Sequence, residues 1–168
     1  VKMANMAQLV NVIAPIFTSE KGMFRQTIFY PLQLFANNVY GTSLDVFVDC
    51  KTYNTNKFFL GLGETTTQQS KVPYLDVSAT YKEGEVMICV VNRNKEEAIT
   101  TDIISQQGSF SGVFSVSEVN GPDVKAGNDF SKENIKTVTK SPVNVNGSKF
   151  TYSFPPHSFT LLKGKLQK

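Results

Sequence analysis

The sequence predicts a mainly β protein, an antiparallel β-sandwich with a jelly-roll-like arrangement, preceded by a short stretch of a different class. From Thr42 onward, short apolar runs with period-two alternation follow one another and are separated by turn residues. The residues before Thr42 instead show the spacing of an α/β unit. A length of 168 residues fits one domain, or one domain with an appendage.

The first element is apolar and has two interpretations. Residues 1–17 contain no acidic residue and no glycine. Val1 and Met3 fit a short buried strand, but apolar residues also recur at helical spacing, and periodicity does not decide between the two. The residues at helical spacing are Met3, Met6, Val10, Ile13 and Phe17. A polar break at residues 18–22 follows.

The next element is a helix that begins near Pro31 and ends before Gly41. Proline suits the first turn, where its missing N–H has no intrahelical partner. Leu32, Phe35 and Val39 then recur at helical spacing. One strand and one helix cannot bury their own faces, so we expect residues 1–41 to belong to a larger α/β body, such as a barrel or layered sheet, with a part missing upstream.

The remaining elements are strands. Residues 44–50 alternate, with Leu44, Val46, Val48 and Cys50 on one face and Asp45, Phe47 and Asp49 on the other. Further strands are predicted at Val72–Tyr81, Glu85–Arg93, Ala98–Ile104, Val113–Val119, Ile135–Thr139, Lys149–Phe154 and Ser158–Leu162. Turn residues between them include Glu83-Gly84 and Asn146-Gly147. The Thr/Gly/Gln-rich stretch Asn54–Gln69 is predicted to be a loop. Seven or eight short strands are typical of a sandwich or jelly roll.

Composition excludes several classes of function. Seventeen basic and 14 acidic residues leave a net charge of +3, dispersed along the chain, which does not favour a nucleic-acid partner. No apolar run reaches the roughly 18–20 residues of a transmembrane helix, so no membrane partner is expected. Cys50 and Cys89 permit at most one disulfide, and free thiols are equally consistent with their apolar surroundings.

No residue pattern indicates a catalytic or metal site. The only histidine, His157, stands beside Ser158 without a second histidine to act as base, so it is interpreted as a structural residue. Two distant cysteines and one histidine lack metal-ligand spacing. Asp123, Asp129 and Glu133 lack the spacing of an EF-hand and fit a solvated loop. Residues 61–64 lack the Lys-Ser/Thr ending of a phosphate-binding loop. We expect no cofactor and no metal.

Two N-terminal runs carry a resemblance to a known family. The run VKMANMAQLVNVIAPI at residues 1–16, followed by RQTIFYP at residues 25–31, resembles the end of the catalytic barrel of glycoside hydrolase family 51, the α-L-arabinofuranosidases. Weaker motifs continue in the expected order and extend the similarity over nearly the whole chain. They are VPYLDVS at 72–78, VVNR at 90–93, VNGPD at 119–123, NDF at 128–130 and FPPHSF at 154–159.

The resemblance implies a (β/α)8 barrel followed by a C-terminal β-sandwich. Residues 1–42 would be the last strand and helix of an incomplete barrel, with Val1–Ala7 as its eighth strand and Pro31–Tyr40 in its last helix. Residues 43–168 would be the C-terminal β-sandwich domain. The two-class pattern along the chain agrees with this division.

Gln8 is the candidate substrate-binding residue that the resemblance implies. It would lie at the C-terminal end of the eighth strand, the face where barrel active sites are built. The family places there a glutamine that hydrogen-bonds the arabinofuranosyl unit in the subsite before the scissile bond. A carboxamide can donate to one sugar hydroxyl and accept from another. Without the resemblance, Gln8 would be interpreted as closing a strand or capping a turn.

The family's catalytic residues have no counterparts here. Its retaining hydrolysis uses two glutamates, and both belong to barrel strands that would precede Val1. Neither Glu20, Glu64 nor a later carboxylate matches, so no catalytic residue is assigned and the chain alone is expected to be inactive.

The resemblance therefore predicts the C-terminal part of an enzyme that removes terminal α-L-arabinofuranosyl residues from arabinose-containing hemicellulose and pectin. Its expected partners are the upstream catalytic barrel of the same protein, arabinose-containing oligo- or polysaccharide through that barrel, and further copies in a homo-oligomer. The sandwich would brace the barrel and contribute to that oligomer. A stand-alone carbohydrate-binding module is the alternative, weakened by the absence of tryptophan and by aromatics at inward positions. The compartment is open between a secreted protein, which we favour, and a cytoplasmic one.

Overall fold

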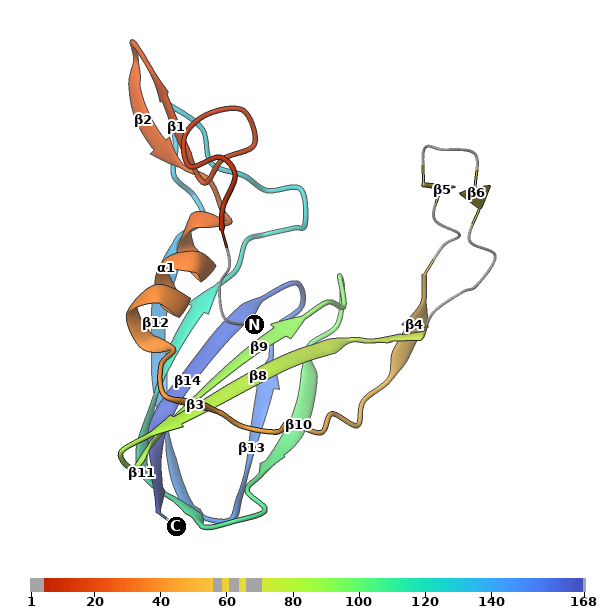
Figure 1. The fold of residues 1–168 in the computed structure, drawn as a ribbon, viewed down its shortest axis with the longest axis vertical. Helices are drawn as coiled ribbons and strands as arrows, with labels where there is room; N and C mark the ends of the chain where they lie inside the picture. The colour runs from red at the N-terminus through yellow and green to blue at the C-terminus, as the bar shows by residue number, and fades with distance from the viewer. Residues whose placement is uncertain (1–4, 56–58, 61–63, 66–70, 168) are drawn as a thin grey trace.

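The computed structural model describes residues 5–55, 59–60, 64–65 and 71–167, and its centre is an antiparallel sheet of six strands. The strand order is β12-β11-β14-β9-β8-β3. In chain order their bounds are Thr42–Ser43 (β3), Leu75–Lys82 (β8), Glu85–Asn92 (β9), Ser109–Val119 (β11), Thr137–Gly147 (β12) and Phe159–Gln167 (β14). Figure 1 shows this sheet with β10 and β13 on one side and the helix α1 on the other.

One face of the six-stranded sheet forms the sandwich core with the two-stranded sheet of β10 (Ile99–Ile104) and β13 (Lys149–Phe154). Phe110 and Phe114 of β11 and Phe150 of β13 meet there, with ring centroids 5.1–5.7 Å apart. Phe114 and Leu162 are fully buried in this cluster. The predicted mainly β, antiparallel sandwich is confirmed.

The other face of the sheet is covered by α1 (Phe29–Asn38). Tyr30 and Leu34 of the helix pack with Met87 and Cys89 of β9. Alternate residues of β9, such as Ile88, face the sandwich core instead. A sheet covered on both faces needs apolar residues at consecutive positions, which explains the continuous apolar run at residues 86–91.

The predicted helix is present but lies two residues earlier in the chain. It ends at Asn38, and Val39 is already extended. Pro31 lies in the first turn, as expected, and the N–H of Val39 donates to Phe35 O at 2.9 Å. Gly41 has φ +93 and leads the chain into β3.

The helical interpretation of the first seventeen residues is wrong for the described part. Residues 5–15 are irregular, and β1 (Ile16–Ser19) and β2 (Gly22–Arg25) form a hairpin that the sequence did not predict. Positive φ angles of 60° at Asn11 and Val12 break any helix there. The polar break at residues 18–22 supplies the hairpin turn.

The strand expected at Val1–Ala7 is only partly covered, because residues 1–4 lie outside the described residues. Residues 5–7 form no ladder in this chain. A barrel strand forms its ladder with a neighbour on each side, and the resemblance places those neighbours upstream. Its place in a barrel stays a prediction.

The segment 44–50, predicted as a strand, is extended without forming a ladder. Its alternation is nevertheless real, because Leu44, Val46, Val48 and Cys50 pack against the sandwich core. The segment is held to the sheet edge at its two ends: Leu44 N donates to Ala79 O at 2.9 Å, and Tyr74 N donates to Lys51 O at 3.0 Å. Between the pairs Ser43↔Thr80 and Thr52↔Pro73 it is two residues longer than the chain opposite, so it bows away from β8.

Most other predicted strands are confirmed with shifted ends. The range Val72–Tyr81 is divided at Tyr74 into β7 (Lys71–Pro73), which pairs with β4 (Thr52–Asn54), and β8. The strand expected at Ile135–Thr139 is the longer β12, in which Pro142 lies in a register shift on an edge strand, where its missing N–H breaks no ladder. The strand expected at Ser158–Leu162 extends to Gln167 as β14.

The turn predicted at Glu83-Gly84 is present, and the predicted loop Asn54–Gln69 contains some strand structure. Glu83 and Gly84 both have positive φ, 51° and 85°, as a two-residue hairpin turn between β8 and β9 requires. The stretch Asn54–Gln69 contains the short pair β5 (Phe59–Leu60) and β6 (Glu64–Thr65). Residues 56–58, 61–63 and 66–69 of it lie outside the described residues. Within the described ranges no helix is long and apolar enough to cross a membrane.

Candidate functional site

Gln8 is exposed and leads into a tightly tied loop, residues 9–15. Val10 forms a bridge with Ile16, and Asn11 N donates to Ile16 O at 2.8 Å. The Asn11 side chain accepts a hydrogen bond from Thr18 N at 2.8 Å. Val12 adopts φ 60°, which is unfavourable for a β-branched residue. These bonds and this strained backbone fix the segment that follows Gln8 to the β1–β2 hairpin.

The hairpin is attached to the sandwich by a pair of oppositely charged residues, Arg25 of β2 and Glu133 in the loop between β11 and β12. Arg25 donates to the two carboxylate oxygens from Nε at 3.1 Å and from Nη2 at 2.9 Å. The main-chain N–H of Arg25 donates to Glu133 Oε1 at 3.0 Å. Tyr30 Oη of α1 donates to Glu133 Oε2 at 3.2 Å. One carboxylate therefore holds both the hairpin and the helix.

A buried asparagine in the same loop makes a second attachment. Asn128 is 7% exposed. Its Nδ2 donates to Arg25 O at 2.8 Å and to Ile135 O at 2.7 Å, and its Oδ1 accepts from Ile135 N at 2.8 Å. Both the N–H and the C=O group of Arg25 are thus hydrogen-bonded to the sandwich loop.

Aromatic contacts complete the junction. Phe24 of β2 is buried between Phe17 of β1, with ring centroids 5.1 Å apart, and Phe130 of the sandwich loop, 4.8 Å away edge to face. Such aromatic pairs contribute about 0.5–1.5 kcal/mol beyond their buried area. We refer to the Arg25–Glu133 pair with Asn128 and Phe130 as the hairpin clamp.

The electrostatics of the clamp follow from its hydrogen bonds. The hydrogen bond from the Arg25 side chain is the main reason that the pKa of Glu133 is lowered to about 2. The same bond raises the pKa of Arg25. Burial is the main reason that the pKa of Tyr30 is raised. The pair is therefore ionised and the phenol neutral at neutral pH.

The acidic residues considered for calcium have other roles. Glu133 is bonded to Arg25, and Asp129 Oδ1 accepts from the backbone and side chain of Ser131 at 2.7 and 2.5 Å. Asp123 accepts from Lys125 N in a turn. Among the described residues no three His, Cys, Asp or Glu side chains form a group that could hold a metal ion.

The remaining candidates are structural. His157 has φ 45° in the turn before β14, and its N–H donates to Asn94 O at 2.8 Å. The buried Ser158 hydroxyl donates to Pro155 O at 2.7 Å, so it is bonded within the turn. Cys50 and Cys89 are free thiols. The structure shows no catalytic arrangement of these groups.

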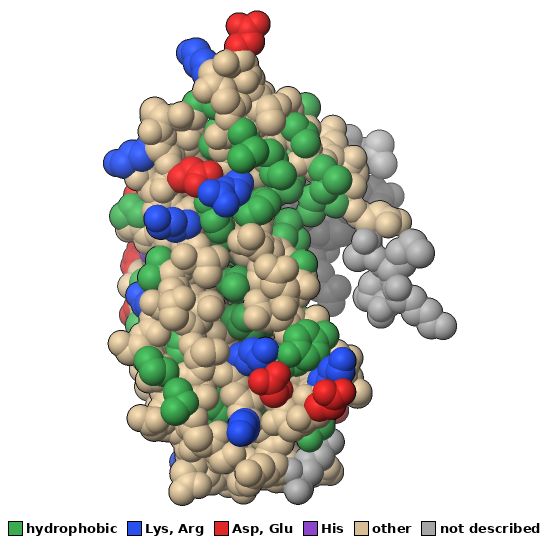
Figure 2. Space-filling view, turned by 90° about the vertical axis from the view of Figure 1, so that its left-hand side faces the viewer, with side chains coloured by type: hydrophobic (Ala, Val, Ile, Leu, Met, Phe, Trp, Pro, Cys, Tyr) green, Lys and Arg blue, Asp and Glu red, His purple; other side chains and the backbone are tan. Residues whose placement is uncertain are grey.

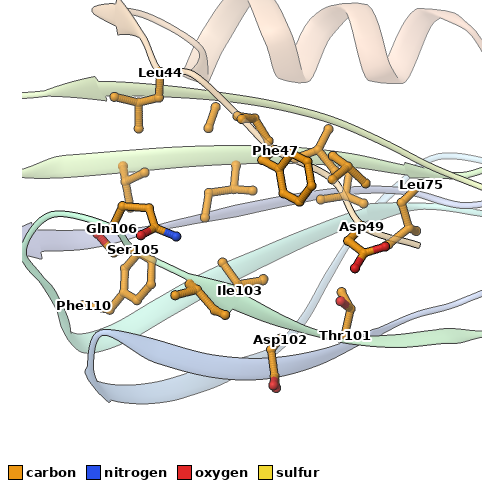
Figure 3. A pocket seen from close by; sticks show the side chains of 18 of the residues that line it. Leu44, Phe47, Asp49, Leu75, Thr101, Asp102, Ile103, Ser105, Gln106 and Phe110 are labelled. Atoms are coloured by element: carbon orange, nitrogen blue, oxygen red, sulfur yellow. The ribbon is translucent and has the colours of Figure 1, made fainter. Parts of the chain in front are cut away.

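A cavity of about 1160 Å³ separates the segment 44–49 from β10. Figure 3 shows Leu44, Phe47 and Asp49 on one side of it and Thr101 and Ile103 on the other. Its floor is formed by apolar core residues of β8 and β9. The Asp102 carboxylate is bonded to Lys149 and Thr151 of β13, at 3.1 and 2.6 Å. The cavity is therefore the open edge of the sandwich rather than a cluster of reactive groups.

Sequence reasoning missed the hairpin clamp. Arg25 and Glu133 are 108 positions apart, and no local pattern marks either residue as half of a pair. The sequence signals near them were the runs RQTIFYP and NDF, which pointed to a family rather than to a contact.

Comparison with known proteins shows which family the chain resembles. Residues 1–158 match the family described as the alpha-L-arabinofuranosidase C-terminal domain. A probable alpha-L-arabinofuranosidase C of Aspergillus niger is 39% identical over 168 residues, which is 98% of this chain and 30% of the relative. The intracellular exo-alpha-(1->5)-L-arabinofuranosidase 1 of Bacillus subtilis is 31% identical over 171 residues, 99% of this chain and 32% of the relative. The chain thus spans about a third of the length of these relatives.

Solved structures agree with the sequence relatives. The alpha-L-arabinofuranosidase of Thermotoga maritima, solved as an arabinose complex, superimposes with a TM-score of 0.76 at 25% identity. The superposition covers 95% of this chain and 33% of that structure. Nearly the whole chain therefore superimposes on about a third of a larger structure.

Proposed function

Because this chain belongs to the alpha-L-arabinofuranosidase C-terminal domain family, we propose that it completes the catalytic barrel of an α-L-arabinofuranosidase and braces that barrel with its sandwich. The observation that carries the proposal is the match of nearly the whole chain to about a third of each relative. Residues 1–42 supply the last strand and helix of the barrel, and residues 43–168 form the C-terminal sandwich.

An exposed apolar surface around Gln8 supports a barrel partner. Leu9, Val12 and Ile13 are 62%, 72% and 79% exposed, and Met23 of the hairpin is 61% exposed. Figure 2 shows hydrophobic side chains gathered over the upper part of the molecule, where the hairpin and helix lie. Such a grouping is typical of a surface that another part of the protein covers. We assign this surface, Leu9, Val12, Ile13 and Met23, to contact with the upstream barrel.

Gln8 is assigned to the substrate. Its exposed carboxamide lies just before the tied loop, in the connection that would follow the eighth strand at the active-site face of a barrel. There it would donate and accept hydrogen bonds with the hydroxyls of a terminal α-L-arabinofuranosyl unit. Two glutamates of the upstream barrel would carry out retaining hydrolysis. The substrates are arabinose-containing hemicellulose and pectin, and the assembled enzyme is a homo-oligomer.

The experiment joins this chain to the part of the Bacillus subtilis relative that precedes the matched region. Release of p-nitrophenol from p-nitrophenyl α-L-arabinofuranoside is measured for the chimera, for the chain alone and for a Gln8→Ala chimera. Activity in the first, none in the second and a loss of about 100-fold in the third supports the assignment. A folded chimera without activity, or an active isolated chain, contradicts it.

A stand-alone carbohydrate-binding module is the second candidate, and Phe47 favours it. This side chain is 91% exposed, borders the open cavity beside β10 and lies between the exposed Asp45 and Asp49 along the segment 44–50. The aromatic ring can stack on the face of a sugar, and the flanking carboxylates can accept hydrogen bonds from its hydroxyl groups. Affinity electrophoresis in arabinan and arabinoxylan tests this candidate. Retardation that Phe47→Ala abolishes supports it, and unretarded migration of the wild-type chain excludes it.

A further inference from the structure

A continuous series of contacts connects the sandwich to the loop behind Gln8. Glu133 binds the side chain and main-chain N–H of Arg25. Arg25 pairs with Ile16 across the hairpin, and Ile16 bridges Val10, which is two residues after Gln8. Three contacts therefore separate a residue of the β11–β12 loop from the segment that carries the substrate-binding candidate.

The segment at the end of this series has few other attachments. Leu9, Val10 and Val12 are exposed and pack against no described core cluster. The loop is ordered by burial of Ala14 and Pro15 at its end and by hydrogen bonds to the hairpin. These bonds run from Asn11 N to Ile16 O at 2.8 Å, from Thr18 N to Asn11 Oδ1 at 2.8 Å and from Gln26 N to Pro15 O at 2.8 Å. Its position therefore depends on where the hairpin is held.

The hairpin in turn is held mainly from the sandwich. Its contacts include those with Glu133, Asn128 and Phe130 of one loop. They also include the rings of α1, where the Arg25 guanidinium lies 5.6 Å from the ring centres of both Phe29 and Tyr30. Glu133 is the residue that joins these contacts, because it also accepts from Tyr30.

We propose that Glu133 of the sandwich is a positioning residue, which sets the location of Gln8 at the active site through Arg25 and the β1–β2 hairpin. This inference rests on the proposed function and adds to it a role of the sandwich in catalysis. A substrate-binding carboxamide must be held within a fraction of an ångström to favour the transition state. The sandwich, which lies outside the barrel, supplies that constraint.

The first test uses this chain alone and does not depend on activity. Glu133→Gln keeps the shape of the side chain and removes its charge. Hydrogen exchange is followed at the amides of Asn11, Thr18 and Gln26, which are bonded within the loop and hairpin. We expect exchange at these amides to accelerate about tenfold. Asp102→Asn is the matched control, because it removes a comparable ion pair between Asp102 of β10 and Lys149 of β13, and it should leave the three amides unchanged.

The second test uses the complete enzyme, the chimera described above, and asks whether Glu133 acts through Gln8. With Gln8 present, Glu133→Gln should lower kcat about tenfold with less change in KM, at an unchanged folded fraction. With Gln8→Ala already in place, Glu133→Gln should lower kcat less than twofold, because the two residues act in series. A purely structural role would lower activity equally in both backgrounds.

The outcomes separate this inference from the proposed function. Unchanged exchange at the three amides overturns the inference, as does an equal loss of kcat in both backgrounds. Accelerated exchange together with a loss that depends on Gln8 supports it. A folded complete enzyme that does not hydrolyse the arabinofuranoside overturns the proposed function, and the inference about catalysis is lost with it. Accelerated exchange would then show that Glu133 still positions the loop.

Discussion

Gly164 in β14 lies directly against the ring of Phe114 in β11, so that a Cβ on Gly164 would overlap three carbons of that ring. Phe114 is completely buried and contacts Phe110 and Phe150 in the centre of the sandwich core. The absence of a side chain at residue 164 therefore leaves space for a fully buried aromatic ring in the core.

Gly164→Ala should consequently destabilise the protein. The added methyl group must displace a ring that is packed on all sides, and overpacking of this kind costs about 1–3 kcal/mol. Urea unfolding of the wild type and the variant measures the difference. Gly127→Ala is the control, because nothing lies within 4 Å of a Cβ there, and it should change the free energy of unfolding by less than about 0.5 kcal/mol. Equal stability of the two variants would contradict the proposed packing.

Lys140→Met should be destabilising although the lysine is at the surface. Lys140 Nζ lies 3.1 Å from the carboxylate of Glu118, whose side chain is only 6% exposed and whose Oε2 has no hydrogen-bond partner. Removing the cation leaves a buried carboxylate unpaired, at a cost of about 1–3 kcal/mol. Lys149→Met removes an equally close cation from Asp102, which is solvated, and should not measurably change the unfolding midpoint. A similar loss in both variants would contradict this difference in burial.

The Glu133→Gln variant should lose stability in a pH-dependent way. The pKa of Glu133 is lowered from 4.5 to about 2 in the folded state, so ionisation of this group favours folding. That contribution is complete above the unfolded pKa and is lost as the pH falls from about 4.5 toward 2. The difference in melting temperature between wild type and variant should therefore be largest near neutral pH and shrink in acid. A difference that is constant across this range would mean that the charge is not involved.

Cys89 should be unreactive in the folded protein. Its thiol is 3% exposed, and burial raises its pKa to about 12. Because the thiolate is the reacting form, a disulfide reagent such as DTNB should not modify it at mildly alkaline pH until the chain unfolds. The Cys50→Ser variant leaves Cys89 as the only cysteine, so its reaction can be followed alone before and after adding guanidinium. If Cys89 in the folded Cys50→Ser variant reacted as fast as in guanidinium, the sheet face that α1 covers would be accessible to the reagent.

The sandwich strands could largely be predicted from sequence because their information is local. Alternation and turn residues located the eight-residue β9 to within one residue and β13 in full. The ends of β12 and β14 were missed for physical reasons. Pro142 and the polar residues around it suit an edge strand that is half solvated, and Lys163 and Gly164 interrupt an apolar pattern in a strand flanked by β9 and β11.

The junction near Gln8 could not be predicted in the same way. Whether residues 16–25 pair with one another depends on the contacts of Phe24 and Arg25 with a loop more than 100 positions away. The helical spacing of Val10, Ile13 and Phe17 was coincidental, because the positive φ angles at Asn11 and Val12 are set by the loop's hydrogen bonds. Gln8 was identified only through the family resemblance, because no local pattern distinguishes it from a glutamine that closes a strand or caps a turn.

The packing of α1 on the six-stranded sheet also determines how this protein can be cut for expression. A truncation that starts at residue 43, where the sequence changes class, would delete Tyr30 and Leu34 and leave Met87, Cys89 and Phe159 facing water. Such a fragment would expose an apolar sheet face and would tend to aggregate even with β8, β9, β11, β12 and β14 intact. A fragment meant to isolate the sandwich should therefore begin before Phe29, so that the helix is retained as the cover of the sheet.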